Sequence, residues 1–460
     1  MCLLASAVLL TFSMPPYTLW PLAFVALVPL IAGARGLGFQ WGCRFGFVWG
    51  FLVAAATTPW FWSIFRGSSA ALWTLLGGFW GLSLGLVRQV FAQREAAARP
   101  VLSALVAATC WTGVEYFRAE VWPLKFALCS LGSTQVVGPF LPLMAFVGLT
   151  GVTLLVAAVN VLLALALERR DARPAAVAAA LAALALAARF VPVTLTEGPG
   201  HAPGGPAVKV ALLQAEGAVV PEMATMSRQP AAKDVDLLVW PEYCVFDFPL
   251  EVPALQQAFD EVAREHHATF LYGGKQHADH HWYDTIFALD SAAKPLGWFH
   301  KAQPIPLFDD GLPGKEFAPI ATPQGPLGVM VCYDSDFSWI SRRITDAGAE
   351  LLVVPTLDAA SWGSTQHQQR VPLCQARAVE NGRWLVRAAS SGVSAIIAPD
   401  GTVTARLDAG VGLLPGTVRR LTGRTPFTRG GWLLAPLSLA FTLIAGLVLG
   451  LRRPRPPIAG

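Results

Sequence analysis

Three polar residues of the 460-residue chain each follow a short apolar run that is typical of a buried β-strand. Glu242 follows VDLLVWP, Lys301 follows GWFH, and Cys332 follows LGVMV. Residues just beyond the carboxyl ends of strands in α/β folds gather around a shared crevice. We therefore expect an acid, an amine and a thiol to converge at one place.

Such a group of side chains predicts acyl transfer through a covalent thioester. The thiolate is the reactive form of cysteine, and a neighbouring cation such as Lys301 lowers the thiol pKa. Lys301 could also stabilise the oxyanion of a tetrahedral intermediate, with the backbone N–H of Tyr333 as a second donor. Glu242 could take the thiol proton and return it to the leaving group. Cys332 is then the nucleophile.

Each residue also has a structural interpretation. A cysteine at a strand end is usually a packing residue, an acid after Trp-Pro usually belongs to a turn, and a single lysine is usually a solvated charge. Because the three residues occur in succession, each after a predicted strand, we favour a catalytic role for them. The HADHH cluster (277–281) could suggest a metal, but we interpret it as a polar loop. The seven cysteines lack CxxC spacing, so we predict neither a metal nor a cofactor.

The stretch 206–424 alternates strand-like and helix-like segments. ALQQAFDEVAREHH (254–267) has the periodicity of an amphipathic helix, and Asp400-Gly401 is typical of a hairpin turn. The pattern predicts an α/β sandwich built on mixed sheets. The predicted buried strands are VKVALLQA (208–215), VDLLVW (235–240), TFLYGG (269–274), LGVMVC (327–332), ELLVVP (350–355) and WLVRAAS (384–390).

The remaining sequence is typical of a membrane protein. The chain is 54% hydrophobic and 14% charged, against about a quarter charged in ordinary soluble proteins. We predict a transmembrane domain of about seven helices over 1–193, a catalytic domain over 206–424 and a transmembrane helix over 431–451. The eight candidate spans are 1–13, 19–34, 39–60, 70–92, 101–117, 140–168, 174–193 and 431–451.

Basic residues between these spans predict the orientation. The net charge is only +4, and its distribution does not indicate a nucleic-acid partner. Cytoplasmic loops carry an excess of Lys and Arg, and eight spans, seven before 206–424 and one after it, then put this stretch on the outer, periplasmic face of a bacterial inner membrane. One set of alternate loops holds Arg35, Arg88, Arg94, Arg99, Arg169, Arg170, Arg173, Arg452, Arg453 and Arg455, and the other holds Arg66, Arg118 and Lys125.

The motifs resemble those of the nitrilase, or carbon–nitrogen hydrolase, superfamily. VWPE, HK and VCYD resemble its Glu-Lys-Cys signature, and ARAVENGRWLVRAASSGVSAIIAPDG resembles its downstream pattern. The resemblance covers roughly 207–415. It implies an α-β-β-α sandwich in which Glu242, Lys301 and Cys332 form the catalytic triad.

The apolar segments narrow this resemblance. SMPPYTLWPLAFVALVPLI and WTGVEYFRAEVWPLKFALCSLGSTQVVGPF are similar to membrane segments of the apolipoprotein N-acyltransferase family. The resemblance implies that Cys332 accepts an acyl chain from a membrane phospholipid. The chain then passes to the α-amine of a diacylglyceryl-cysteine at the N-terminus of a lipoprotein. We expect the enzyme to act as a monomer.

The resemblance also suggests supporting residues. Where the family usually has HLVPFGE after the lysine, this chain has AQPIPLFDDG, so Asp309 is the closest positional match to a second Glu, with Asp310 as the alternative. Asp334 stands where the family has Glu. LDAASWG resembles NDAWFG and nominates Trp362, and the VWPE motif nominates Trp240.

Two other functions are compatible with part of this pattern. A membrane-anchored nitrilase-type amidase would use the same triad with water as the acceptor. It would need at most one anchor, whereas eight predicted spans favour the acyltransferase. A catalytically inactive scaffold is the third possibility, and the complete set of Glu242, Lys301 and Cys332 argues against it.

Overall fold

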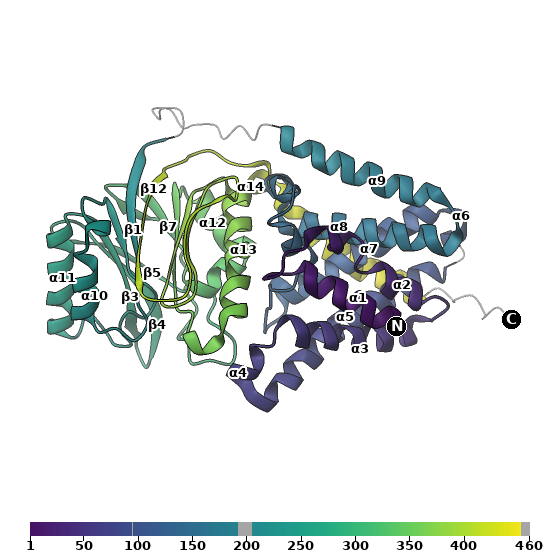
Figure 1. Cartoon of the computed structure of the whole chain (residues 1–460), viewed down its shortest axis with the longest axis horizontal. Helices are drawn as coiled ribbons and strands as arrows, with labels where there is room; N and C mark the ends of the chain where they lie inside the picture. Colours follow the sequence, from purple (N-terminus) through teal and green to yellow (C-terminus); the bar gives the residue numbers. More distant parts are fainter. Residues whose placement is uncertain (94, 192–204, 452–460) are drawn as a thin grey trace. The chain divides into compact units, whose positions relative to one another are not determined.

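The computed structural model describes residues 1–93, 95–191 and 205–451. The chain divides into two compact units, Met1–Pro192 with Gly430–Gly460, and Val193–Arg429 (Figure 1). Several residues used to predict the orientation lie outside the described residues. They are Arg94, Arg452, Arg453, Arg455 and the last two residues of the predicted span 174–193.

The first unit is helical throughout, because its long apolar segments leave few polar side chains to compete with backbone hydrogen bonds. Short 3₁₀ and π segments interrupt it, among them Leu131–Gln135 and Phe117–Val121. Its α-helices are α1 (Cys2–Ser13), α2 (Val28–Gly33), α3 (Phe39–Thr57), α4 (Phe61–Phe65), α5 (Ser69–Phe91), α6 (Glu95–Ala98), α7 (Pro100–Tyr116), α8 (Met144–Arg169), α9 (Ala172–Ala187) and α15 (Leu434–Leu451).

Four helical segments are long and apolar enough to cross a membrane: Phe61–Phe91, Leu141–Arg169, Ala172–Phe190 and Gly431–Leu451. They correspond to four of the eight predicted spans. The first two predicted spans form shorter apolar helices, Cys2–Ser13 and Trp20–Gly33, and α3 and α7 do not reach the same length and hydropathy. Helix length thus supports four spans, and the orientation stays a prediction.

Close packing of α3 on α5 depends on glycine. A Cβ atom at Gly81 of α5 would lie 2.7 Å from the backbone oxygen of Cys43, and one at Gly77 would lie 3.0 Å from that of Phe47. Small residues let helix backbones approach each other where lipid supplies no hydrophobic drive for association. These glycines therefore define the contact face of the pair.

Two six-stranded sheets form the centre of the second unit, in the orders β12-β1-β2-β3-β4-β5 and β11-β10-β9-β8-β7-β6. In each, three central strands are parallel and the outer strands are antiparallel. The strands are β1 (Ala207–Gln214), β2 (Leu237–Val239), β3 (Thr269–Ala278), β4 (His281–Leu289), β5 (Pro295–His300), β6 (Ile320–Thr322), β7 (Gly325–Val329), β8 (Leu351–Thr356), β9 (Leu385–Ala389), β10 (Ser394–Ile397), β11 (Val403–Leu407) and β12 (Gly412–Arg419).

Helices cover the outer face of each sheet. Helices α10 (Val220–Ser227) and α11 (Pro253–His266) lie on the first sheet, and α12 (Ser338–Asp346) and α13 (Ser364–Asn381) lie on the second (Figure 1). A short helix, α14 (Pro426–Arg429), ends the unit. The predicted fold class, an α-β-β-α sandwich together with a unit of apolar helices, is confirmed.

Trp240 belongs to the core of this sandwich. Its side chain is fully buried, its indole N–H donates to Ser227 Oγ at 3.0 Å, and its ring packs on Phe259 and Phe270. The residue that motif resemblance nominated as a supporting site residue therefore packs between the first sheet and its helices.

The turn after β2 comes very close to β3 at Gly273. A Cβ atom at this position would lie 2.7 Å from the backbone nitrogen of Tyr243 and 2.9 Å from the Cα of Glu242. Cβ atoms in proteins do not come so close to backbone atoms. The backbone here cannot relieve the clash by changing a rotamer, as a side chain could. A glycine on β3 therefore sets where Glu242 lies.

We predict that Gly273→Ala lowers the stability of the second unit by about 1–3 kcal/mol, the usual result of overpacking a buried site. It should also displace Glu242 and reduce activity. Thermal unfolding together with an activity assay measures both effects. Gly412→Ala is the matched control, because its Cβ would meet only Leu407, at an ordinary 3.4 Å. Equal behaviour of the two variants would contradict the prediction.

Candidate active site

Glu242, Lys301 and Cys332 follow β2, β5 and β7, and the structure brings the first two into direct contact. Lys301 Nζ lies 2.6 Å from Glu242 Oε1. All three residues are buried, with exposed fractions of 1%, 1% and 2%. The first two come from one sheet and Cys332 from the other, so the site lies between the sheets at their strand ends.

Two sharp turns present the acid and the thiol. Cys332 has φ of +48° and Tyr243, directly after Glu242, has φ of +47°. Left-handed backbone is uncommon for residues with a side chain, and it persists only where the surroundings enforce it. The Cys332 turn continues as a 3₁₀ segment, Cys332–Asp336. Such a turn lifts a nucleophile out of the line of its strand, as in the nucleophile elbow of hydrolases.

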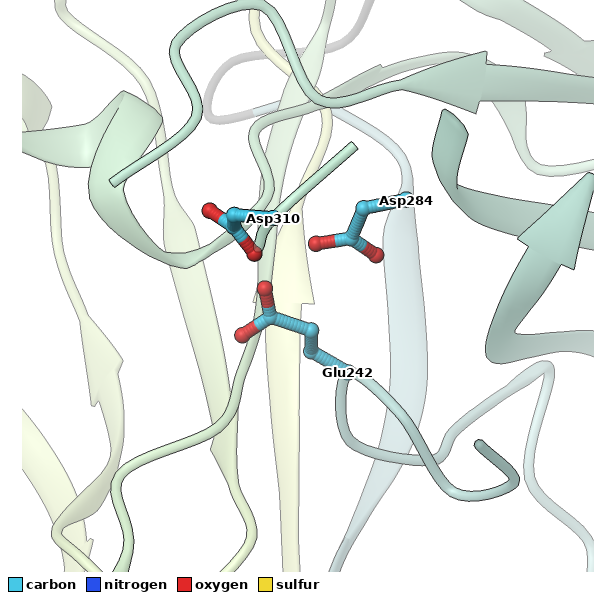
Figure 2. Close-up of side chains that lie close together, drawn as sticks. All are labelled: Glu242, Asp284 and Asp310. Atoms are coloured by element: carbon cyan, nitrogen blue, oxygen red, sulfur yellow. The ribbon is translucent and has the colours of Figure 1, made fainter. Parts of the chain in front are cut away.

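The Lys301 ammonium lies among three carboxylates. Figure 2 shows Glu242, Asp284 and Asp310 turned toward one another, and Lys301 Nζ is 2.6, 3.1 and 2.8 Å from their oxygens. Oxygens of these three acids lie within 4.8 Å of one another, a spacing that suits a cation, and the lysine supplies one. Burial alone would lower the pKa of Lys301, but the carboxylates outweigh it and hold that pKa well above its usual range.

Two of these acids have pKa values that shift in opposite directions. Burial opposes ionisation of Glu242, but Lys301 and the backbone N–H of Leu357, 2.5 Å from Oε2, more than offset it and lower the Glu242 pKa. Burial, and then the charge of Glu242, hold the pKa of Asp284 well above its usual range. Glu242 therefore ionises more readily than Asp284.

Cys332 is a thiol in this environment. Burial, and then the charge of Glu242, raise its pKa well above the usual value, although Lys301 and Arg370 act in the opposite direction. Its sulfur lies 3.7 Å from the backbone oxygen of Leu357 and 3.8 Å from Arg370 Nη2. The sequence-based expectation that Lys301 would lower the thiol pKa has the right sign for that one interaction but the wrong net result, because burial and the charge of Glu242 outweigh it.

Asp334 connects the lysine and cysteine segments. Its carboxylate accepts hydrogen bonds from the backbone N–H groups of Ala302, Gln303 and Val331, at 3.1, 2.7 and 3.0 Å. Burial raises its pKa to about 7 despite these donors. The residue does not contact Lys301 Nζ or Cys332 Sγ, so the structure gives it a positioning role.

Asp310, and not Asp309, meets the lysine. Asp310 is buried and also accepts hydrogen bonds from the Ile305 N–H, at 2.6 Å, and from the Tyr243 hydroxyl, at 3.2 Å. Asp309 is exposed. Of the two acids that the sequence nominated, Asp310, the alternative, is therefore the one in contact with the lysine, because residue spacing does not reveal which of two adjacent acids turns inward.

The remaining nominated residues lie around the site. The Tyr333 ring packs edge-on against Phe337 at 5.0 Å between ring centres. Trp362 ends the 3₁₀ segment Ala360–Trp362 after β8, and its ring lies 6.1 Å from that of Phe308. The first contact lies in the turn after β7, and the second joins the loop after β5 to the segment after β8.

Sequence reasoning missed two residues, Asp284 and Arg370. Asp284 lies on β4, where its backbone oxygen accepts the Lys301 N–H at 2.8 Å, so the strand ladder brings it beside the lysine. An acid near the start of the strand pattern YDTIFALD was the available signal. Arg370 is one of several arginines on or near α13, and its spacing carried no signal.

Known proteins match both parts of the chain. The family described as Carbon-nitrogen hydrolase matches residues 209–424, and the Apolipoprotein N-acyltransferase N-terminal domain matches residues 6–162. Apolipoprotein N-acyltransferase of Azotobacter vinelandii is 29% identical over 501 residues, covering 98% of this chain and 94% of the relative. That of Geobacter metallireducens is 28% identical over 437 residues, covering 85% and 84%.

A solved structure also aligns with this chain. Saccharomyces cerevisiae Nit3, a member of branch 10 of the nitrilase superfamily, is 20% identical with a TM-score of 0.41, covering 46% of this chain and 90% of that one. Because two family descriptions match consecutive parts of the sequence, and relatives of one name align along most of both chains, this protein belongs to the apolipoprotein N-acyltransferase family.

Proposed function

We propose that this protein transfers a fatty acyl chain from a membrane phospholipid to the N-terminal α-amine of a diacylglyceryl-cysteine lipoprotein. The observation that carries the proposal is the buried group of Glu242, Lys301 and Cys332 at the ends of three strands. The name shared by the relatives supports the acceptor class. Apolar helices in the same chain give a lipid donor a route to the enzyme.

The first half-reaction forms a thioester. Glu242 takes the proton of the Cys332 thiol as the sulfur attacks the ester carbonyl of the phospholipid, and an S–C bond forms. Lys301 Nζ and the backbone N–H of Tyr333 stabilise the oxyanion. When the intermediate collapses, the ester C–O bond breaks and Glu242 returns its proton to the departing lysophospholipid.

The second half-reaction moves the acyl chain to nitrogen. The lipoprotein α-amine attacks the thioester carbonyl and gives a proton to Glu242. The C–S bond breaks, an amide forms, and the Cys332 sulfur recovers the proton. Because every residue of the cycle comes from one chain, the proposal requires only a monomer.

We predict that phospholipid alone leaves an acyl chain on Cys332, because a ping-pong enzyme completes its first half-reaction without the acceptor. Intact-mass analysis measures the adduct, and lysophospholipid should appear before any lipoprotein is added. Cys332→Ala should abolish the adduct. Cys374→Ala, which removes another buried thiol, is the control and should retain it. Ammonia release from small amides without an acyl adduct would instead indicate an amidase.

We predict that Asp310→Asn slows acylation of Cys332 by on the order of tenfold to a hundredfold, whereas Asp309→Asn has little effect. Loss of one ion-pair partner lets the Lys301 ammonium shift, and a misplacement of about 1 Å can reduce a rate about a hundredfold. The two adjacent variants form a matched pair, assayed by the initial rate of adduct formation. A larger effect at Asp309 would contradict the assignment of Asp310.

The arginine distribution predicts that the catalytic unit lies on the periplasmic face of the inner membrane. A reporter enzyme that is active only after export, fused after Pro206, should be active in whole cells. A reporter that is active only in the cytoplasm, fused at the same junction, should be silent. The reverse pattern would mean that an even number of spans, and not the predicted seven, precedes the catalytic unit.

A further inference from the structure

A buried arginine contacts the candidate nucleophile. Arg370 projects from α13 into the site with only 5% of the residue exposed. Its Nη2 lies 3.8 Å from Cys332 Sγ, and its Nη1 forms an ion pair with Asp336. The guanidinium also lies 5.4 Å from the ring centre of Tyr333. The side chain is thus held on both sides, with one N–H aimed at the sulfur.

Arg370 and Lys301 differ in the number of carboxylates that pair with their positive charge. Lys301 Nζ has three carboxylates at or within 3.1 Å. Arg370 has one direct carboxylate partner among the described ion pairs, and its planar fork leaves a second edge for another acceptor. Both cations favour the thiolate of Cys332, Lys301 more strongly than Arg370. Arg370 is the one with an N–H in contact with the sulfur, at 3.8 Å.

We propose that Arg370 is a further catalytic residue, whose Nη2–H stabilises the Cys332 thiolate when the sulfur attacks and again when it leaves. The assignment rests on the proposed acyl transfer for its place in the cycle. Its contact with the reacting sulfur is a feature of the site itself.

The chemistry of the sulfur explains why this contact helps. In the resting thiol and in the thioester, the sulfur carries little charge and is a weak hydrogen-bond acceptor. In both half-reactions it passes through a thiolate-like state, once as the S–C bond forms and once as it breaks. A donor that binds this state more strongly than the neutral ones lowers both barriers. Glu242 holds the proton meanwhile, so no other reactant is needed.

Four charged groups from four elements act on the sulfur. Glu242 after β2 and Asp358 after β8 disfavour the thiolate, whereas Lys301 after β5 and Arg370 on α13 favour it. Asp358 is itself paired with Arg387, at 2.5 Å. Asp336 faces Arg370 from the other side. Removal of Arg370 therefore shifts the balance toward the thiol.

The test is the pH dependence of Cys332 alkylation by iodoacetamide, in the full chain in detergent, followed by mass spectrometry of the Cys332 peptide. Arg370→Gln should raise the pH midpoint by ~1–2 units and slow alkylation near neutral pH by about tenfold to a hundredfold, the usual effect of losing a charge-assisted hydrogen bond. Arg370→Lys keeps a cation but loses the planar guanidinium. Its pH midpoint should lie between those of the unmodified protein and Arg370→Gln.

Asp336→Asn is the matched control, because it breaks the same ion pair and leaves the arginine in place. If Arg370 only positions the Cys332–Asp336 turn, both variants should raise the midpoint alike, and the proposal is overturned. If Arg370 stabilises the thiolate, Asp336→Asn should leave the midpoint unchanged or lower it. An unchanged midpoint in Arg370→Gln would also overturn the proposal.

A double variant protects the test against misfolding. Arg370→Gln alone leaves the Asp336 carboxylate buried without its partner, which can destabilise a protein strongly. Arg370→Gln with Asp336→Asn removes both charges, and its midpoint should exceed that of Asp336→Asn alone. Alkylation needs no phospholipid or lipoprotein, so the result stands whether or not the protein proves to be an acyltransferase.

Discussion

The Lys301 ammonium is the constraint around which the second unit is arranged. A charge that is 1% exposed survives only if counter-charges surround it. Here they come from the turn after β2, from the middle of β4 and from the loop after β5. Three segments that are distant in sequence are thereby held at one point, and each acid that is removed leaves its partner's charge less compensated. The same ion cluster then serves chemistry, because it fixes the carboxylate that must accept a proton.

This charge balance also determines how the thiol is activated. Burial disfavours the thiolate of Cys332 most strongly, and the charge of Glu242 adds to this effect, so Lys301 and Arg370 do not bring the thiol pKa down to its usual value. Cys332 therefore rests as a thiol, and the proton leaves only as the reaction proceeds, toward Glu242. The charge of Glu242 also opposes ionisation of Asp284, because like charges repel. The two buried acids are thus distinguished by their neighbours and not by residue type.

Much of this could be predicted from sequence, and the exceptions have a common cause. Glu242, Lys301 and Cys332 could be found because each follows a strand. Glu242 and Cys332 follow the central parallel strands β2 and β7, and Lys301 follows the edge strand β5, which two antiparallel pairings make run in the same direction as β3. Asp284 and Arg370 lie inside a strand and a helix, so their approach to the site depends on ladder register and on helix rotation, which residue spacing does not encode. Trp240, two residues before Glu242, packs against Ser227, Phe259 and Phe270, which motif resemblance alone did not indicate. Eight apolar segments were recognised, and among the described residues four form helices of spanning length and hydropathy.

The turns at Glu242 and Cys332 explain why the site is formed by backbone as much as by side chains. Positive φ at Cys332 and Tyr243 turns the chain sharply at two strand ends that belong to different sheets. Asp334 closes one turn through the Val331 N–H and holds the lysine segment through two more donors, while Gly273 leaves room for the other turn. A thiol that needs a base at the moment of attack depends on this geometry more than a preformed thiolate would, because proton transfer requires hydrogen-bond reach. The buried acids and the strained turns therefore serve the same purpose. Both hold the base and the nucleophile within hydrogen-bond reach of each other.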